Sequence, residues 1–148
     1  MRTDYSCGVI PIVSDGAFRR YLLVRHGAGH WAFPKGHPEG AETRLETARR
    51  ELLEETGLAR VDVLEEPVFS EAYAFTKRSG KEVQKRVDYF LGRVQPPATV
   101  ALQEAEVSDH AWGRAQETAD RMTFREGREL LARVEAFIRG GGAAGIGL

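Results

Sequence analysis

Two long strand-like segments dominate the middle of the chain and constrain its fold more than any other feature. Residues 61–75 (VDVLEEPVFSEAYAF) and 82–94 (EVQKRVDYFLGRV) flank the turn sequence KRSGK, which predicts a β-hairpin. Two further strands are expected earlier, at 6–13 (SCGVIPIV) and 21–26 (YLLVRH). WAF, before Pro34, is a short apolar piece, and HAWG near residue 110 could form another short strand.

Helices are expected between and after these strands. Residues 43–56 carry Leu45, Ala48 and Leu52 at core spacing, and residues 124–139 carry an apolar face that includes Leu130 and Val134. A helical turn is expected at 116–121, and residues 95–111 read as a polar loop. Strands, a helix, more strands and a final helix predict an α+β or layered α/β/α domain around a mixed sheet. We expect one domain over 1–139 and a flexible glycine-rich tail over 140–148.

Charge and composition narrow the classes of function. The net charge of −1 supplies no global basic field, so no stable nucleic-acid partner or anionic membrane is expected, and any anion site must be local. The single Cys7 excludes an internal disulfide framework and is expected to be buried. The N-terminal apolar run is short and interrupted by Pro11, so neither a signal peptide nor a membrane span is expected and a cytoplasmic protein is the default.

The sequence RELLEETG, residues 50–57, gathers acids in an unfavourable place. Glu51, Glu54 and Glu55 stand at i, i+3 and i+4, on one face of the predicted helix. Two of them lie in the last turn before Gly57, at the negative end of the helix dipole. A solvated acidic face is one interpretation, and a divalent cation site is the other. A bound Mg²⁺ or Mn²⁺ would remove the electrostatic conflict, and carboxylates are its preferred ligands.

The segment upstream supports the cation interpretation. In KGHPEG, the carbonyl of Gly36 could add a neutral ligand, and Lys35 offers a positive charge for phosphate. Arg50 lies one turn before Glu54 and could hold its carboxylate ionised as a ligand or a base, although an ordinary surface pair would look the same in sequence. A metal beside a phosphate site would neutralise charge and activate a water for attack on phosphorus.

Gly36, Glu42 and the run from Arg50 to Leu58 resemble the Nudix box with every fixed position filled. The resemblance implies a Nudix α/β/α sandwich with a mixed sheet, metal-dependent hydrolysis of a nucleoside diphosphate linked to another moiety, and metal binding by Glu51, Glu54 and Glu55. It also implies that Glu42 is an accessory acid of the same site.

The flanks of the box resemble one branch of that superfamily, the asymmetric diadenosine tetraphosphate hydrolases. WAFPKGHPEG is similar to their W-x-x-P-K-G-H segment, and EAYAF with KEVQKRVDYFL is similar to their second strand pair. EGAE departs from the E-P-G-E of many relatives and shifts a glycine in the loop. The resemblance implies cleavage of diadenosine tetraphosphate to ATP and AMP.

Several residues are candidates for the substrate site, each with a structural alternative. Tyr73 or Tyr89 could stack on adenine or simply be buried, and Lys85 could meet a distal phosphate or lie on a solvated strand face. His37 could touch phosphate or order its loop. In the acidic loop, the resemblance implies a further ligand or base, with Glu106 preferred over Glu104. His26, His30 and His110 lack zinc-ligand spacing.

Two other readings stay open. Another Nudix pyrophosphohydrolase would act on inositol pyrophosphates, RNA 5′ ends or nucleoside triphosphates, and a non-catalytic nucleotide sensor would be expected to lose a box acid. The expected partner is a small nucleotide, and the protein is expected to be a monomer or homodimer.

Overall fold

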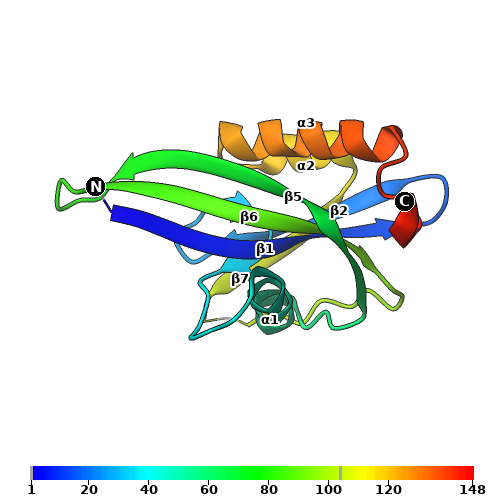
Figure 1. Cartoon of the computed structure of the whole chain (residues 1–148), viewed down its shortest axis with the longest axis horizontal. Helices are drawn as coiled ribbons and strands as arrows, with labels where there is room; N and C mark the ends of the chain where they lie inside the picture. The colour runs from blue at the N-terminus through cyan, green and yellow to red at the C-terminus, as the bar shows by residue number, and fades with distance from the viewer. Residues whose placement is uncertain (1, 104) are drawn as a thin grey trace.

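A seven-stranded mixed sheet forms the centre of the protein (Figure 1). The computed structural model describes residues 2–103 and 105–148. Its strands are β1 (Arg2–Ser14), β2 (Arg19–His26), β3 (Trp31–Ala32), β4 (Lys35–Gly36), β5 (Val61–Thr76), β6 (Glu82–Val94) and β7 (Val107–Gly113). The order is β3-β2-β1-β6-β5, with β4 paired to β1 and β7 paired to β2. β1 and β6 run parallel, and the other pairs are antiparallel.

Helices cover the two faces of the sheet. Figure 1 shows α1 (Arg44–Thr56) below it, and α2 (Ala115–Arg121) with α3 (Arg125–Arg139) above it. Alternation along β1 feeds both cores, because successive side chains of a strand point to opposite faces. Cys7 and Val9 pack with α1 residues, whereas Ile10 and Ile12 pack with α3 residues. The predicted α/β/α arrangement, the hairpin and both long helices are confirmed.

Two segments differ from the sequence prediction. In this part of the chain, a strand was expected only at HAWG. Strand β7 instead begins at Val107, inside the expected polar loop. Its polar residues Ser108 and Asp109 are exposed, so the stretch lacks a strong apolar pattern, and its pairing with β2 supplies what local sequence does not. Lys35–Gly36, expected as loop, forms β4 because it pairs with β1.

The glycine-rich segment 140–148 is packed against the domain, although a flexible tail was expected. It contains a 3₁₀ turn, Ala144–Ile146, and Ala143 is fully buried. Ile146 and Leu148 pack against the α3-side core, and Arg93 donates a hydrogen bond to the carbonyl of Gly147 at 3.2 Å. The few apolar side chains among the glycines therefore anchor this segment. No helix in the described part of the chain is long and apolar enough to cross a membrane.

Candidate functional site

Local hydrogen bonds fix both ends of the acidic helix α1. Thr43 Oγ1 accepts the N–H of Glu46, and the Glu46 carboxylate accepts the N–H of Thr43, which is a reciprocal cap. Gly57 ends the helix in the left-handed region, with φ of 76°, and donates its N–H to the carbonyl of Leu53. The caps set where the helix begins and ends, and therefore which way the acids of its last turns point.

Three carboxylates meet beside the last turns of α1. Glu51 and Glu55 are 7% and 2% exposed, and Glu106 reaches them from the loop before β7. One oxygen from each lies within 4.8 Å of the others. The pairing of Val107 with His26, on β2, brings this loop to the helix. Glu104, the less favoured candidate in the same loop, lies outside the described residues.

Gly36 makes room for this cluster. A Cβ built at Gly36 would lie 2.1 Å from the Glu51 carboxyl carbon, far inside normal contact. Strand β4 is held in place by its pairing with β1, where Gly36 faces Cys7, and by the Lys35 N–H, which donates to Glu55 Oε1 at 3.0 Å. A carboxylate can therefore lie directly against the backbone, where the neighbouring carbonyl is a further oxygen donor.

Arg50 ties the box acids together. Its guanidinium donates to both oxygens of Glu42, at 2.7 and 3.0 Å, to Glu51 at 3.0 Å and to Glu54 at 3.1 Å. A further bond reaches the carbonyl of His37 at 2.9 Å, which joins the helix to the loop after Gly36. Hydrogen bonds from Arg50, first among the causes, hold the pKa of Glu42 at about 2. The surface-pair alternative for Arg50 therefore fits poorly, because its side chain is only 19% exposed and serves several partners.

Glu54 differs from its two neighbours. Its side chain is 41% exposed and is paired with Arg50. Among the described residues, the group of acids close enough to share an ion contains Glu51, Glu55 and Glu106 and not Glu54. The structure therefore divides the three helix acids into two buried members of a cluster and one exposed member at its rim.

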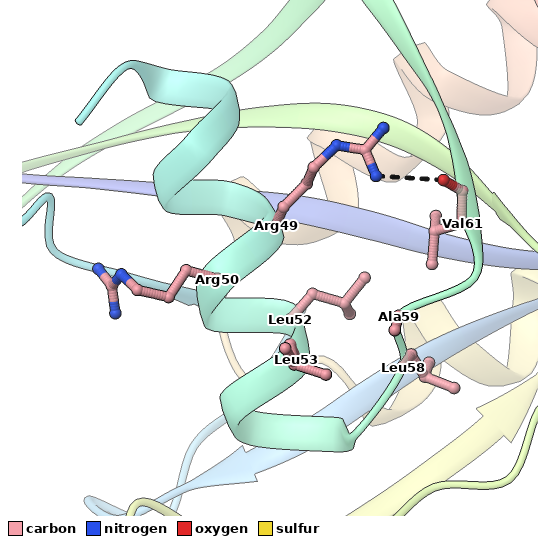
Figure 2. A pocket seen from close by; sticks show the side chains of 7 residues that line it. All are labelled: Arg49, Arg50, Leu52, Leu53, Leu58, Ala59 and Val61. Atoms are coloured by element: carbon pink, nitrogen blue, oxygen red, sulfur yellow. Dashed lines mark hydrogen bonds between the residues drawn. The ribbon is translucent and has the colours of Figure 1, made fainter.

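A second hollow lies on the other side of α1 and carries no such chemistry. Leu52, Leu53, Leu58 and Val61 line much of it. Figure 2 shows the guanidinium of Arg49 reaching across to the carbonyl of Val61, a bond of 3.2 Å, while the side chain of Arg50 leaves the helix in the opposite direction. Arg50 lines this hollow as well, but the three clustered acids line the other pocket.

The buried acids are electrostatically strained. Burial raises the pKa of Glu55 to about 8; the Lys35 N–H opposes this shift, and the charge of Glu51 adds to it. Burial also raises the pKa of Glu51, against the opposing hydrogen bond from Arg50. A divalent cation among these oxygens would relieve both the desolvation and the mutual repulsion. The all-oxygen donor set fits Mg²⁺ or Mn²⁺.

Two lysines line the pocket that contains the acid cluster. This pocket has a volume of about 340 Å³. Lys35 comes from β4, and burial followed by the charge of Lys85 lowers its pKa. Lys85 comes from β6 and is 7% exposed, so the solvated-face alternative does not hold for it. His37 also lines the pocket, and its Nε2 lies 2.7 Å from Asp4 Oδ1. A pocket lined by both carboxylates and lysine side chains suits a metal-bound polyphosphate.

The two tyrosine candidates have different environments. Tyr73 stacks on Phe124, with ring centroids 5.5 Å apart and 24° between the planes. Tyr89 is 1% exposed and packs edge-on against Phe33 in the core. Because both faces of Tyr89 are enclosed, the stacking role expected of it is corrected to a packing role, and Tyr73 remains the candidate.

Sequence reasoning missed Phe124 and His26. Phe124 was expected to open the last helix; it is its N-cap residue, is 40% exposed, and lies against His30 as well as Tyr73. His26 stacks on His30 at 4.9 Å, and its Nδ1 lies 3.8 Å from Glu55. A large aromatic side chain at a helix start was a usable signal for Phe124. The place of His26 depends on the β2–β7 pairing, which local sequence does not reveal.

Comparison with known proteins gives a consistent result. The NUDIX domain family matches residues 4–134. The mouse bis(5′-nucleosyl)-tetraphosphatase [asymmetrical] is 28% identical over 131 residues, covering 88% of this chain and 87% of that protein. An RNA pyrophosphohydrolase of Caulobacter vibrioides is 30% identical over 150 residues, covering 90% of this chain and 86% of that protein.

Two further matches differ in extent. The putative mutator protein MutT4 of Mycobacterium tuberculosis is 34% identical over 114 residues, but the chain spans only 41% of its length. Among solved structures, a C. elegans Ap4A hydrolase in a binary complex superposes with a TM-score of 0.79 at 24% identity, covering 92% of this chain and 98% of that one. This structural match supports the fold, while the sequence matches support the family.

Proposed function

The chain belongs to the Nudix hydrolase family, and from that premise we propose that it hydrolyses dinucleoside polyphosphates, cutting diadenosine tetraphosphate to ATP and AMP. The observation that carries the proposal is one pocket lined both by the carboxylate cluster and by Lys35 and Lys85. The mouse relative, a bis(5′-nucleosyl)-tetraphosphatase, supports this substrate class.

Each group in the pocket has a separate task. Glu51, Glu55, Glu106 and the Gly36 carbonyl would hold Mg²⁺ or Mn²⁺. When bound, the metal supplies charge neutralisation at phosphate and lowers the pKa of a coordinated water.

The lysines bind and orient the polyphosphate. Lys85 is fixed by hydrogen bonds, and Lys35 is held by strand β4. An ammonium in a partly desolvated site stabilises developing negative charge more strongly than it would in water. We assign His37, at the outer edge of the pocket, to phosphate contact or to ordering of its loop.

Glu54 is the proposed general base. It is the helix acid outside the buried cluster, and Arg50 fixes its carboxylate beside that of Glu51. In the reaction, a water oxygen bonds to a bridge phosphorus, the water proton passes to Glu54, and the bond to the leaving nucleotide breaks. Arg50 acts as the positioning residue that keeps the carboxylate oriented.

Tyr73 and Phe124 form the proposed base-binding surface. Tyr73 on β5 lies opposite Lys85 on β6 and is half-buried, and its stacking partner Phe124 is 40% exposed. Stacking of a nucleobase on an aromatic face is worth about 1–3 kcal/mol. The pair would hold one adenosine and leave the polyphosphate to run toward the carboxylates, so attack would fall off-centre.

RNA 5′ ends are the second candidate substrate, because the Caulobacter relative is an RNA pyrophosphohydrolase. The β5–β6 turn also carries three exposed basic residues, Lys77, Arg78 and Lys81, which would suit a polyanion. Product analysis with Mg²⁺ tests both readings against inositol pyrophosphates and nucleoside triphosphates. ATP and AMP in equal amounts from diadenosine tetraphosphate are expected; two ADP would refute the regiochemistry, and brisk turnover of triphosphorylated RNA alone would favour the second candidate. No turnover of any substrate would leave the sensor alternative.

A further inference from the structure

Two side chains near the N-terminal end of β1 hold Lys85, which lines the pocket, and neither belongs to the Nudix box. Lys85 Nζ donates to Asp4 Oδ2 at 3.0 Å and to Ser6 Oγ at 2.8 Å. Ser6 is 1% exposed and lines the pocket together with Lys85, Gly36 and the acidic cluster.

Strand pairing fixes this arrangement. β1 and β6 run parallel, with Asp4 directly opposite Lys85 and Ser6 opposite Val87. Directly opposed and diagonal side chains on one face of a sheet are within contact distance. The lysine therefore meets its two partners because of backbone register, before any ligand is present.

The number of donors gives the arrangement its meaning. An ammonium has three N–H donors and no acceptor. Among the described residues, Asp4 and Ser6 are the hydrogen-bond partners of Lys85 Nζ. Two fixed donors determine the rotation of the third. Because Lys85 lines the pocket while only 7% of the residue is exposed, the pocket is where this third donor can find a partner.

Asp4 also reaches the loop that follows Gly36. Its other oxygen lies 2.7 Å from His37 Nε2. Burial alone would raise the pKa of Asp4, but the hydrogen bonds and charges of Lys85 and His37 outweigh it and hold that pKa below its ordinary value. Asp4 is therefore a carboxylate at neutral pH, with one oxygen on the sheet and one on the loop.

We propose that Asp4 and Ser6 are positioning residues for substrate: they hold the Lys85 ammonium so that its third N–H meets a phosphate oxygen of the polyphosphate. The inference deepens the proposed function and rests on it. Asp4 also holds the loop that contains His37 beside that phosphate. A simple charge-neutralising role for Asp4 would predict the opposite effect on affinity, because removing a nearby anion would strengthen phosphate binding.

The test replaces Asp4 with Ala and with Asn, and Ser6 with Ala. Loss of a charge-assisted hydrogen bond of this kind corresponds to a rise of about tenfold in KM for Asp4→Ala. Lys85 contacts phosphate in the ground state and the transition state alike, so kcat is expected to stay within about twofold. Asp4→Asn keeps an acceptor and should show a smaller rise. Melting temperatures identify any variant that fails to fold.

Two controls separate positioning from general effects. Glu82→Gln removes the same charge from an exposed acid near the same end of the sheet, and Thr3→Ala alters the neighbouring position of β1. Both should leave KM unchanged. On a Lys85→Met background, Asp4→Ala should add less than about a twofold change, because Asp4 acts through the ammonium. An equal rise on both backgrounds would overturn the inference, as would tighter binding in Asp4→Ala.

A binding measurement separates this inference from the proposed function. Calorimetry with inorganic tripolyphosphate and Mg²⁺ reports on the phosphate contact without hydrolysis of a nucleotide. Weaker binding by Asp4→Ala than by wild type supports positioning even if diadenosine tetraphosphate is not cleaved, in which case the proposed function alone falls. Equal binding by the two proteins, or no binding by wild type, overturns the inference.

Discussion

Replacing Gly36 with Ala should remove the metal site while leaving the fold nearly intact. The new Cβ would lie 2.1 Å from the Glu51 carboxyl carbon and 2.3 and 2.4 Å from its oxygens. Normal contact begins near 3.4 Å, so the carboxyl group must move by about 1.3 Å, a shift set by steric exclusion. Backbone strain is not the cause, because Gly36 does not need a left-handed conformation.

The change separates stability from binding because of what the Cβ meets. It meets the flexible end of one side chain, which can swing away. This movement breaks the hydrogen bond of 3.0 Å from Arg50 to Glu51, while the Arg50 guanidinium keeps its other partners. The loss lowers the free energy of unfolding by about 1 kcal/mol. For the metal, a ligand is lost. Since loss of an outer-shell partner alone costs about 10–100-fold in metal affinity, loss of Glu51 should cost at least as much.

Calorimetric titration with Mg²⁺ or Mn²⁺, kcat and the thermal midpoint test this directly. Gly27→Ala is the matched control: its Cβ would lie 3.6 Å from the nearest atom, the Glu106 carbonyl oxygen, which is ordinary contact beside the same site. In a Glu51→Ala background the Gly36 substitution should cost nothing further. Metal affinity and turnover like wild type in Gly36→Ala would refute the assignment of Glu51 as a ligand held against this backbone.

Three further predictions concern the charges and rings of the site. Because the folded-state pKa of Glu55 is raised to about 8 from an ordinary 4.5, the metal-free protein binds extra protons in that window. In chelator, the stability of the protein should therefore fall as pH rises from about 5 to 8, while the stabilisation by millimolar Mg²⁺ should grow. Thermal midpoints that change with pH in the same way in chelator and in Mg²⁺ would contradict this. Glu54→Gln should lower kcat by about 10²–10⁴-fold and leave metal affinity near wild type, whereas Glu55→Gln should weaken metal binding itself; a Glu54→Gln enzyme within a few-fold of wild-type kcat would exclude the base assignment. Tyr73→Ala should raise KM for diadenosine tetraphosphate about 5–100-fold with little change in kcat, and an unaltered KM would show that no base stacks there.

Much of the fold could be read from local sequence because the signals were local. The cap at Thr43, the stop at Gly57 and the turn at 77–81 depend on residues close together in the chain, and α1 and the β5–β6 hairpin formed as expected. β7 was underestimated because its strand character comes from a partner more than eighty residues away. The packed end of the chain was missed because composition does not report what Ile146 contacts.

The candidate site shows the same division. Helical periodicity placed Glu51, Glu54 and Glu55 on one face, yet it could not say which of them the sheet would bury. Lys85 and Tyr89 both lie on β6, and alternation alone left each with a structural alternative. Their environments are set by strand register and by α3, which decide that one lines the pocket and the other joins the core.

The burial of the two inner acids explains why α1 tolerates negative charge at the end where its dipole opposes it. The helix is held by its caps and by Leu52 and Ala48 in the core, so the electrostatic cost falls on the pKa values of Glu51 and Glu55 and not on the helix itself. An arginine among the acids compensates only in part, because Arg50 reaches Glu51 but makes no hydrogen bond to Glu55 among the described residues. Both acids line the pocket beside Gly36, where the absence of a Cβ lets the Glu51 carboxylate lie against the backbone. Stability and function therefore oppose each other at one carboxylate. Protonated Glu55 stabilises the metal-free protein, whereas the proposed reaction needs Glu55 in its ionised form.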